Sequence, residues 1–418
     1  FGADFGKQKI SSIINRNVIC QVMIPKKCEE VQMELMNALK DIEFSISFRK
    51  WCNSSDCYVT VFGYFFTADF EYRSHILGSR KCDDDDDVQA IVKEISDGYK
   101  TDKIKDIKIR CVSDENLSDF EAFPCIVGKI SNVIIAAMKS DTEIKSLIKK
   151  FYELAHRTLK VQMKKSFEES TDEQKLRTLY DLHLYLKASD SNNDAVCDKF
   201  TQLLGSLFSA VSSLTEQSEN GAKCVSANKV YLWLMKLIKY YSSQKSDDTH
   251  AATLCQLIES IKIHEIYKVA VFLDPNFKNL KFLEASGRTV LLDIVKKNLR
   301  RMMGDDEETN SPPLKKLKSN KSHLNDTFLE FMDISMESVD DQLNSEIQCY
   351  MGHKLETPVD LIDYWRDNDC FPYLKKLAKN ILNIPSCTFH SSCCFLSAGN
   401  DFYQKCQNLS ADDVETLT

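Results

Sequence analysis

Glycine and proline are scarce in this chain, with 12 glycines and 8 prolines among 418 residues. Segments that mix polar and apolar residues are long and common, so we expect helix to dominate. No run of about 18 apolar residues occurs, and no membrane span is predicted. The first residues, FGADFGKQKISS, lack the apolar core of a secretory signal. They read like the middle of a longer protein, and we expect an N-terminal module to be missing.

An excess of positive charge is lacking as well. The chain carries 54 Lys and Arg residues against 62 Asp and Glu residues, for a net charge of -8. This balance argues against electrostatic binding of nucleic acid by the whole surface, because such binding needs a basic face. It leaves room for a local basic groove.

Cysteine, by contrast, is abundant, with 16 residues scattered through apolar segments. Examples are Cys111 in IKIRCVS and Cys255 in ATLCQLIESI. Because the chain is long and shows no secretory signal, we expect buried free thiols in a reducing compartment rather than a disulfide framework.

The first 139 residues predict helix and strand in alternation. Residues 1–42 are expected to be helical, with Val31, Leu35, Leu39 and Ile42 near one apolar face. Three strands follow in EFSISF, CYVTVFGYFF (57–66) and FEYRSHIL (70–77), because these segments are short and rich in β-branched and aromatic residues. The acidic run DDDDD (83–87) lacks the glycine-spaced calcium pattern, so it predicts a solvated loop before the helix VQAIVKEISDGY. A fourth strand is predicted in 103–113, giving the order β-β-β-α-β.

The remainder is predicted to be mainly helical. Residues 140–265 show helical periodicity throughout, and a strand-like run returns in IYKVAVFLDPNFKNLKFL (266–283). Residues 304–323 are polar, charged and proline-bearing, and we expect a disordered linker. Within it, PPLKKLKSNK fits either a nuclear-import signal or a soluble basic linker. A long helix and a compact tail follow.

The tail carries the most specific pattern. It reads DLIDYWRDNDCFPYLKKLAKNILNIPSCTFHSSCCFLSAGN and then NLSADDVETL. This resembles the C-terminal dimerisation region of hAT-superfamily transposases. The segment FLDPNFKNLKFL resembles a second family motif through Asp274, Pro275, Phe277 and Lys278. The tail residues that match are Trp365, Phe371, Pro372, Leu374, Leu377, Ala378, Ile384, Pro385, Phe395, Ala398, Gly399, Leu409, Ser410 and Leu417.

The resemblance implies an α/β RNase H-like core that is split by a large all-α insertion, mainly helical overall, with a C-terminal helical dimerisation region. The domains implied are an N-terminal helical segment at 1–42, the first part of the core at 43–139, the all-α insertion at 140–265, the continued core at 266–303, the linker at 304–323 and the dimerisation region that completes the core at 324–418.

RNase H-like transposases use three acidic side chains to hold two divalent ions, about 4 Å apart, which activate the attacking oxygen. Such hard cations need carboxylate oxygens. By the resemblance, the first acid is replaced by Arg49, the second is retained as Asp114, and the third is replaced by Ser392. Asp56 is out of register and does not restore the first position. One carboxylate does not hold two metals, so the resemblance implies a pseudoenzyme.

The cysteines beside Ser392 have rival interpretations. Cys387, His390 and Cys393 have spacings that suit zinc, but no clear fourth ligand beyond the adjacent Cys394 is present. A disulfide between Cys393 and Cys394 would be strained. A Cys–His nucleophile pair would need an oxyanion hole that nothing in the sequence indicates. We expect small packing residues instead.

The implied function is that of a catalytically inactive, domesticated transposase, acting as a dimeric nuclear regulator of transcription or chromatin. DNA would be read by a BED-type zinc finger that this chain lacks; no magnesium, other cofactor or membrane is expected. The alternatives are a scaffold of a chromatin or transposon-silencing complex that does not contact DNA, and an active nuclease. The homodimer core would form with the helix at 326–350 from Trp365, Phe371, Leu374, Leu377, Ile381, Ile384 and Phe395.

Overall fold

The computed structural model describes part of the chain, and the described residues form two compact units. The units are Phe1–His264 with Leu382–Thr418, and Glu265–Ile381. Both are built mainly of helices, and the first also contains a sheet. The described ranges are 23–52, 56–83, 87–100, 109–113, 118–159, 166–188, 195–215, 225–246, 248–303 and 339–388.

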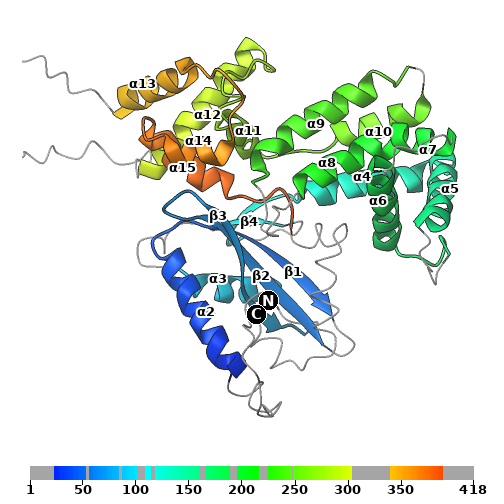
Figure 1. Ribbon diagram of the computed structural model, residues 1–418, viewed down its shortest axis with the longest axis horizontal. Coiled ribbons are helices and arrows are strands. Elements are labelled where there is room, and N and C mark those ends of the chain that lie inside the picture. The colour runs from blue at the N-terminus through cyan, green and yellow to red at the C-terminus, as the bar shows by residue number, and fades with distance from the viewer. Residues whose placement is uncertain are drawn as a thin grey trace, which may run out of the picture. The chain divides into compact units, whose positions relative to one another are not determined.

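A five-stranded mixed sheet lies in the first unit, in the order β3-β2-β1-β4-β5 (Figure 1). The β1–β2 and β2–β3 pairs are antiparallel, whereas β1–β4 and β4–β5 are parallel. The predicted order β-β-β-α-β is confirmed, and β5 is an addition that a three-residue segment does not reveal. The bounds are β1 Ser45–Cys52, β2 Cys57–Phe66, β3 Tyr72–Lys81, β4 Arg110–Val112 and β5 Glu121–Phe123.

One face of this sheet is apolar and packs on two helices, α2 (Ile24–Leu39) and α3 (Val88–Asp97). Leu35 and Leu39 of α2 are buried there as predicted, but Val31 of the same expected face is 40% exposed. Asp87 caps α3, because its side chain accepts a hydrogen bond from the Gln89 amide. The last residue of the acidic run therefore begins the helix, as expected. Residues 84–86 lie outside the described part of the chain.

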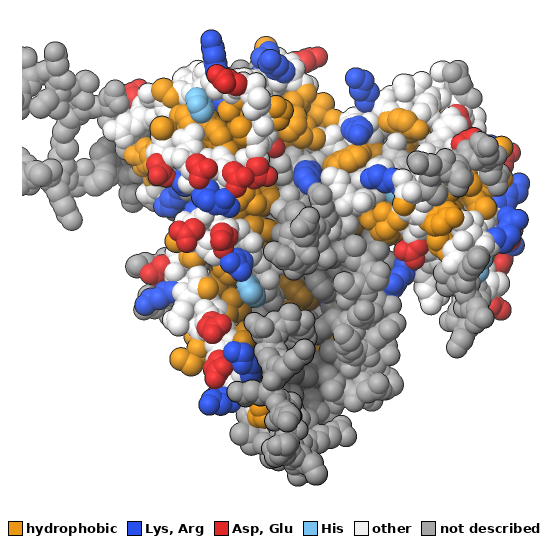
Figure 2. All heavy atoms as spheres, viewed as in Figure 1, with side chains coloured by type: hydrophobic (Ala, Val, Ile, Leu, Met, Phe, Trp, Pro, Cys, Tyr) orange, Lys and Arg blue, Asp and Glu red, His pale blue; other side chains and the backbone are white. Residues whose placement is uncertain are grey.

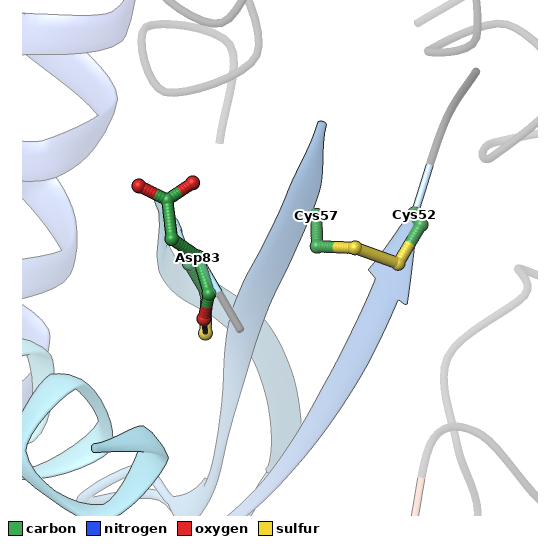
Figure 3. The surroundings of a disulfide bond; sticks show 4 residues. Cys52, Cys57 and Asp83 are labelled. Atoms are coloured by element: carbon green, nitrogen blue, oxygen red, sulfur yellow. Dashed lines mark hydrogen bonds between the residues drawn. A yellow bond between two sulfur atoms is a disulfide. The ribbon is translucent and has the colours of Figure 1, made fainter. Parts of the chain in front are cut away.

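The expectation of free thiols is wrong for one pair of cysteines. Cys52 and Cys57 lie directly opposite each other on β1 and β2, with their Cα atoms 3.9 Å apart, and form a disulfide (Figure 3). The pairing depends on the hairpin register, which brings the last residue of one strand onto the first residue of the next. Among the other described cysteines, Cys28 is half-buried, and Cys349 and Cys370 are exposed free thiols. The buried free thiols that the sequence predicts include Cys111, Cys125, Cys255 and Cys387.

The described residues from 126 to 259 form a helical array, as the sequence predicts for the segment from 140 onwards. Asp141 caps α5 by accepting hydrogen bonds from the amides of Glu143 and Ile144. None of the described helices is both long and apolar enough to cross a membrane. The bounds are α4 Ile126–Ser140, α5 Thr142–Leu159, α6 Asp172–Ala188, α7 Ala195–Phe200, the π-helical turn η2 Thr201–Gly205, α8 Ser206–Leu214, α9 Ala227–Ser242 and α10 Thr249–Glu259.

The described part of the second unit is helical, and the strand predicted within 266–283 is wrong. Ile266–Phe272 forms the helix α11, and six of its seven residues are buried. A short apolar run that is buried on all sides carries no period that separates helix from strand. The linker predicted at 304–323 lies outside the described residues. The other helices are α12 Ala285–Met303, α13 Val339–Gly352, α14 Leu361–Asp367 and α15 Pro372–Leu382.

Candidate functional site: the hydroxyl-rich face of the sheet

The second face of the sheet carries polar side chains in its interior. Side chains alternate along a strand, so Ile46 and Phe48 of β1 point to one face of the sheet. The opposite face receives the remaining side chains of this series: Ser45, Ser47, Arg49 and Trp51. Both serines are buried. Buried hydroxyl groups require hydrogen-bond partners, so this face depends on specific pairing rather than on apolar packing alone.

The partners come from the neighbouring strands. Thr60 Oγ1 of β2 accepts a hydrogen bond of 2.9 Å from Trp51 Nε1 and lies 2.6 Å from Ser79 Oγ of β3. Ser47 Oγ lies 3.0 Å from the Tyr64 hydroxyl. Since all of these groups are neutral, the network stabilises the three strands without holding a charge.

The C-terminal part of the chain completes this face. Asn383 Oδ1 accepts a hydrogen bond of 2.6 Å from Ser45 Oγ, and Asn383 Nδ2 donates to the Glu43 carbonyl at 3.1 Å. Asn383 is 1% exposed. A side chain 338 positions further along the chain therefore fixes the start of β1.

Arg49 occupies the carboxyl-terminal half of β1 on this same face. It lies opposite Thr60 and is half-buried. Asp56, the first acid after Arg49 in the sequence, forms an ion pair of 2.7 Å with Lys81 at the rim of the sheet. The position that the resemblance assigns to a metal-binding aspartate thus presents a cation among hydroxyl groups, and these residues do not fit a divalent ion.

The other two positions of the expected triad, Asp114 and Ser392, lie outside the described residues. Among the residues that the structure describes, no three His, Cys, Asp or Glu side chains come together in a way that could hold a metal ion. The strand that precedes Asp114 is described. It is β4, which runs parallel to β1 with Val112 opposite Ser47. The two strands that the resemblance assigns to the first and second acids are therefore direct neighbours.

A second group of contacts anchors the chain after α15 to the helical array. Cys125 caps α4, and its sulfur accepts hydrogen bonds from the amides of Gly128 at 3.2 Å and Thr388 at 3.3 Å. Ser386 donates its amide to Ser226 Oγ and its hydroxyl to the Leu214 carbonyl. Residues 382–388 are thus held against the starts of two helices and the end of a third. Cys387 is buried here, while His390, Cys393 and Cys394 lie outside the described residues.

The residues predicted to form a dimer core are buried within a single chain. Trp365 is fully buried, stacks on Tyr350 with centroids 5.5 Å apart, and donates its indole N–H to the Leu273 carbonyl at 2.8 Å. Tyr350 in turn donates to the Phe272 carbonyl, and burial raises its pKa well above the usual range. The other described members are also buried: Phe371, Leu374, Leu377, Ile381 and Ile384. Phe395 lies outside the described residues.

Residues of the segment LDPNFK contact this aromatic cluster. Asp274 is buried and accepts hydrogen bonds from the Asn276 amide and side chain. Lys278 is buried as well, donates to the His353 carbonyl, and places its ammonium 5.0 Å from the centre of the Tyr350 ring. Burial lowers the pKa of Lys278. The motif residues therefore have a structural role in the second unit, in which they join α11 to α13 and α14.

Sequence reasoning missed the hydroxyl network. The alternation of Ser45 and Ser47 in SISF was a usable signal, because small polar residues at every second position of a strand mark a polar face. Asn383 and Thr60 gave no such signal, since their pairing depends on the tertiary structure. Neither a comparison with family models nor one with curated proteins finds a match for this chain.

Proposed function

We propose that this chain is the body of a catalytically inactive, domesticated transposase of the hAT type, which acts as a dimeric, nuclear, DNA-associated regulator of transcription or chromatin. The observation that carries the proposal is Arg49. It lies half-buried on β1, beside neutral hydroxyl groups, at the position where the resemblance requires a carboxylate.

The chemistry explains why this substitution matters. A divalent ion beside a guanidinium meets like charge, and the neighbouring Thr60 and Ser79 hydroxyls supply neutral oxygens only. By the resemblance, Ser392 removes a second carboxylate, which leaves Asp114 alone. Two-metal catalysis has no ligand set under this assignment.

The architecture gives the proposal mixed support. The sheet order, with β4 beside β1 and parallel to it, suits the expected core, and so does the anchoring of residues 382–388 on the first unit. The helix α11, in place of the expected strand, removes one element on which the resemblance was built. The proposal therefore rests more on the tail pattern and on Arg49 than on the segment 266–303.

The dimer needs a specific arrangement, because Trp365 and its neighbours are already buried in one chain. We propose either an exchange of the helices around Trp365 between two chains or a contact made by their outer faces. Sedimentation equilibrium of the purified chain tests this. A species of about twice 47.9 kDa supports the dimer, whereas a monomer at every concentration contradicts it.

The alternative, a protein-interaction scaffold without DNA contact, is favoured by one observation, the net charge of -8. A cleavage assay with Mg²⁺ or Mn²⁺ on labelled duplex DNA separates the proposal from an active nuclease. We expect no cleavage. Cleavage that disappears in the variant Asp114→Ala would show an intact active site and end the proposal.

A further inference from the structure

Two segments of this acidic chain, one of which contains α9, carry positive but no negative side chains. The described residues 199–215 and 225–246 contain no Asp or Glu. Figure 2 shows Lys or Arg and hydrophobic side chains together over this helix. The lysines in these two ranges are Lys199, Lys229, Lys236, Lys239 and Lys245.

Aromatic side chains lie among these lysines. Trp233 and Tyr240 are both partly exposed. With Lys236 they lie along one flank of α9, about 100° around the helix axis from the buried stripe of Val230, Leu234, Leu237 and Tyr241. Trp233 and Tyr240 are seven residues apart, or about 10 Å along the helix axis. The Tyr240 ring is held in place because its hydroxyl donates to the Gln202 carbonyl at 2.9 Å. Lys236 Nζ lies 4.4 Å from the centre of the Trp233 ring.

A polar hollow of about 460 Å³ opens at the end of the same helix. Lys199, Gln202, Ser243 and Thr249 are among the side chains that line it, and they supply one charge and several hydrogen-bond donors. Asp248 also lines the hollow, and its carboxylate, which caps α10 through the amides of His250 and Ala251, keeps its negative charge there. The basic and aromatic flank of α9 therefore borders a polar recess that supplies hydrogen-bond donors.

We infer that this surface, defined by Trp233, Lys236, Lys239, Tyr240 and Lys199, binds single-stranded nucleic acid. Lysines paired with exposed aromatic rings are the combination that holds phosphates and stacks unpaired bases. In a duplex the base faces are covered by their neighbours, so rings on a convex helix have nothing to stack on. In the free protein Lys236 covers the indole of Trp233. A phosphate would draw the ammonium away, and a base would take its place on the ring.

The inference deepens the proposed function and rests on it for the choice of DNA as ligand. It is tested with the whole purified chain and a fluorescein-labelled oligothymidine of about 20 nucleotides, in a salt series followed by anisotropy. We expect binding that weakens with salt, and a loss of roughly tenfold or more in Lys236→Glu/Lys239→Glu. The slope of log affinity against log salt should fall by about 1.4, because each phosphate contact on a single strand contributes about 0.7. The matched control, Lys40→Glu/Lys50→Glu, makes the same charge change at exposed sites of α2's end and β1 and should bind like the parent.

Tryptophan emission gives a second readout. Trp51 and Trp365 are buried, so quenching by the oligonucleotide should come from Trp233 and vanish in Trp233→Phe. Trp233→Ala should weaken binding about fivefold or more through lost stacking. Equal binding by the α9 and control variants would overturn the inference. Binding a duplex of equal length more tightly than the single strand would also overturn it. The same holds for binding polyglutamate more tightly than the single strand. Metal-dependent cleavage or a strictly monomeric chain would instead end the proposed function, and the α9 variants would still decide the inference.

Discussion

The two faces of the sheet are both buried on β1, but they are stabilised by different interactions. On one face, Ile46 and Phe48 of β1 pack on α2 and α3, and the contacts are apolar. On the other, Ser45 and Ser47 are equally buried but are held by hydrogen bonds to Asn383 and Tyr64. The first face tolerates other apolar side chains of similar volume, whereas the second requires donors and acceptors in fixed places.

Under the proposed function, this difference explains what the loss of an active site leaves behind. A face that once had to hold charged ligands is not converted to an apolar core by one substitution, because its remaining polar groups still need partners. Under the proposed function, Arg49 and the hydroxyl network are the remnant of such a face.

The largest expected effect comes from the apolar face. Replacing Phe48, which is 6% exposed, with alanine leaves a cavity under α2 and α3. We expect the free energy of unfolding to fall by about 3–5 kcal/mol, measured by urea denaturation. Met33→Ala on α2 is the control, because this side chain is 65% exposed and should change stability by less than about 0.5 kcal/mol. Equal effects of the two variants would show that α2 does not cover this face.

The hydroxyl face should respond to shape-conserving changes. Thr60→Val keeps the volume but leaves the Trp51 N–H and the Ser79 hydroxyl without the atom that joins them. We expect a loss of about 1–3 kcal/mol. Adding Ser79→Ala and Trp51→Phe removes the stranded donors and should recover part of that loss. If Thr60→Val left the free energy of unfolding unchanged, the hydrogen bonds through Thr60 would not stabilise the sheet.

The disulfide ties the ends of the two strands that carry both faces. It closes a short loop between Cys52 and Cys57, and a loop of this length contributes about 2 kcal/mol. Cys52→Ser/Cys57→Ser should lower the free energy of unfolding by about that amount under oxidising conditions. Under reducing conditions the parent and the variant should become similar. A difference that persists in reductant would show that the sulfurs act through packing alone.

His183 in α6 is a buried polar group that titrates, whereas the buried hydroxyl groups of the sheet do not. Burial, and then the nearby Lys187, lowers the pKa of His183 in α6 to about 4. The unfolded chain protonates this histidine near pH 6.5, so its contribution is complete above that pH and is lost as pH falls towards 4. His183→Gln should flatten this part of the stability profile. An unchanged profile would show that His183 has the same pKa in the folded and the unfolded chain.

The sequence predicted the elements better than the contacts between them. The strand 57–66 was predicted to the residue, because β-branched and aromatic side chains fill it and turns bound it. The helix α11 was missed because its apolar run is equally suited to a buried strand. Within the candidate site, Arg49 was placed by a motif, but Asn383 could not be paired with Ser45 from spacing. The Cys52–Cys57 bond was missed because it depends on hairpin register.

The most direct test of the central claim is a titration of the chain with Mn²⁺, followed by the spectroscopic signal of free Mn²⁺, with Arg49→Asp/Ser392→Glu measured alongside. We expect no stoichiometric binding of Mn²⁺ by the parent, and binding by the variant in which both carboxylates are restored. Two Mn²⁺ ions bound per parent chain, and lost in Asp114→Ala, would contradict it.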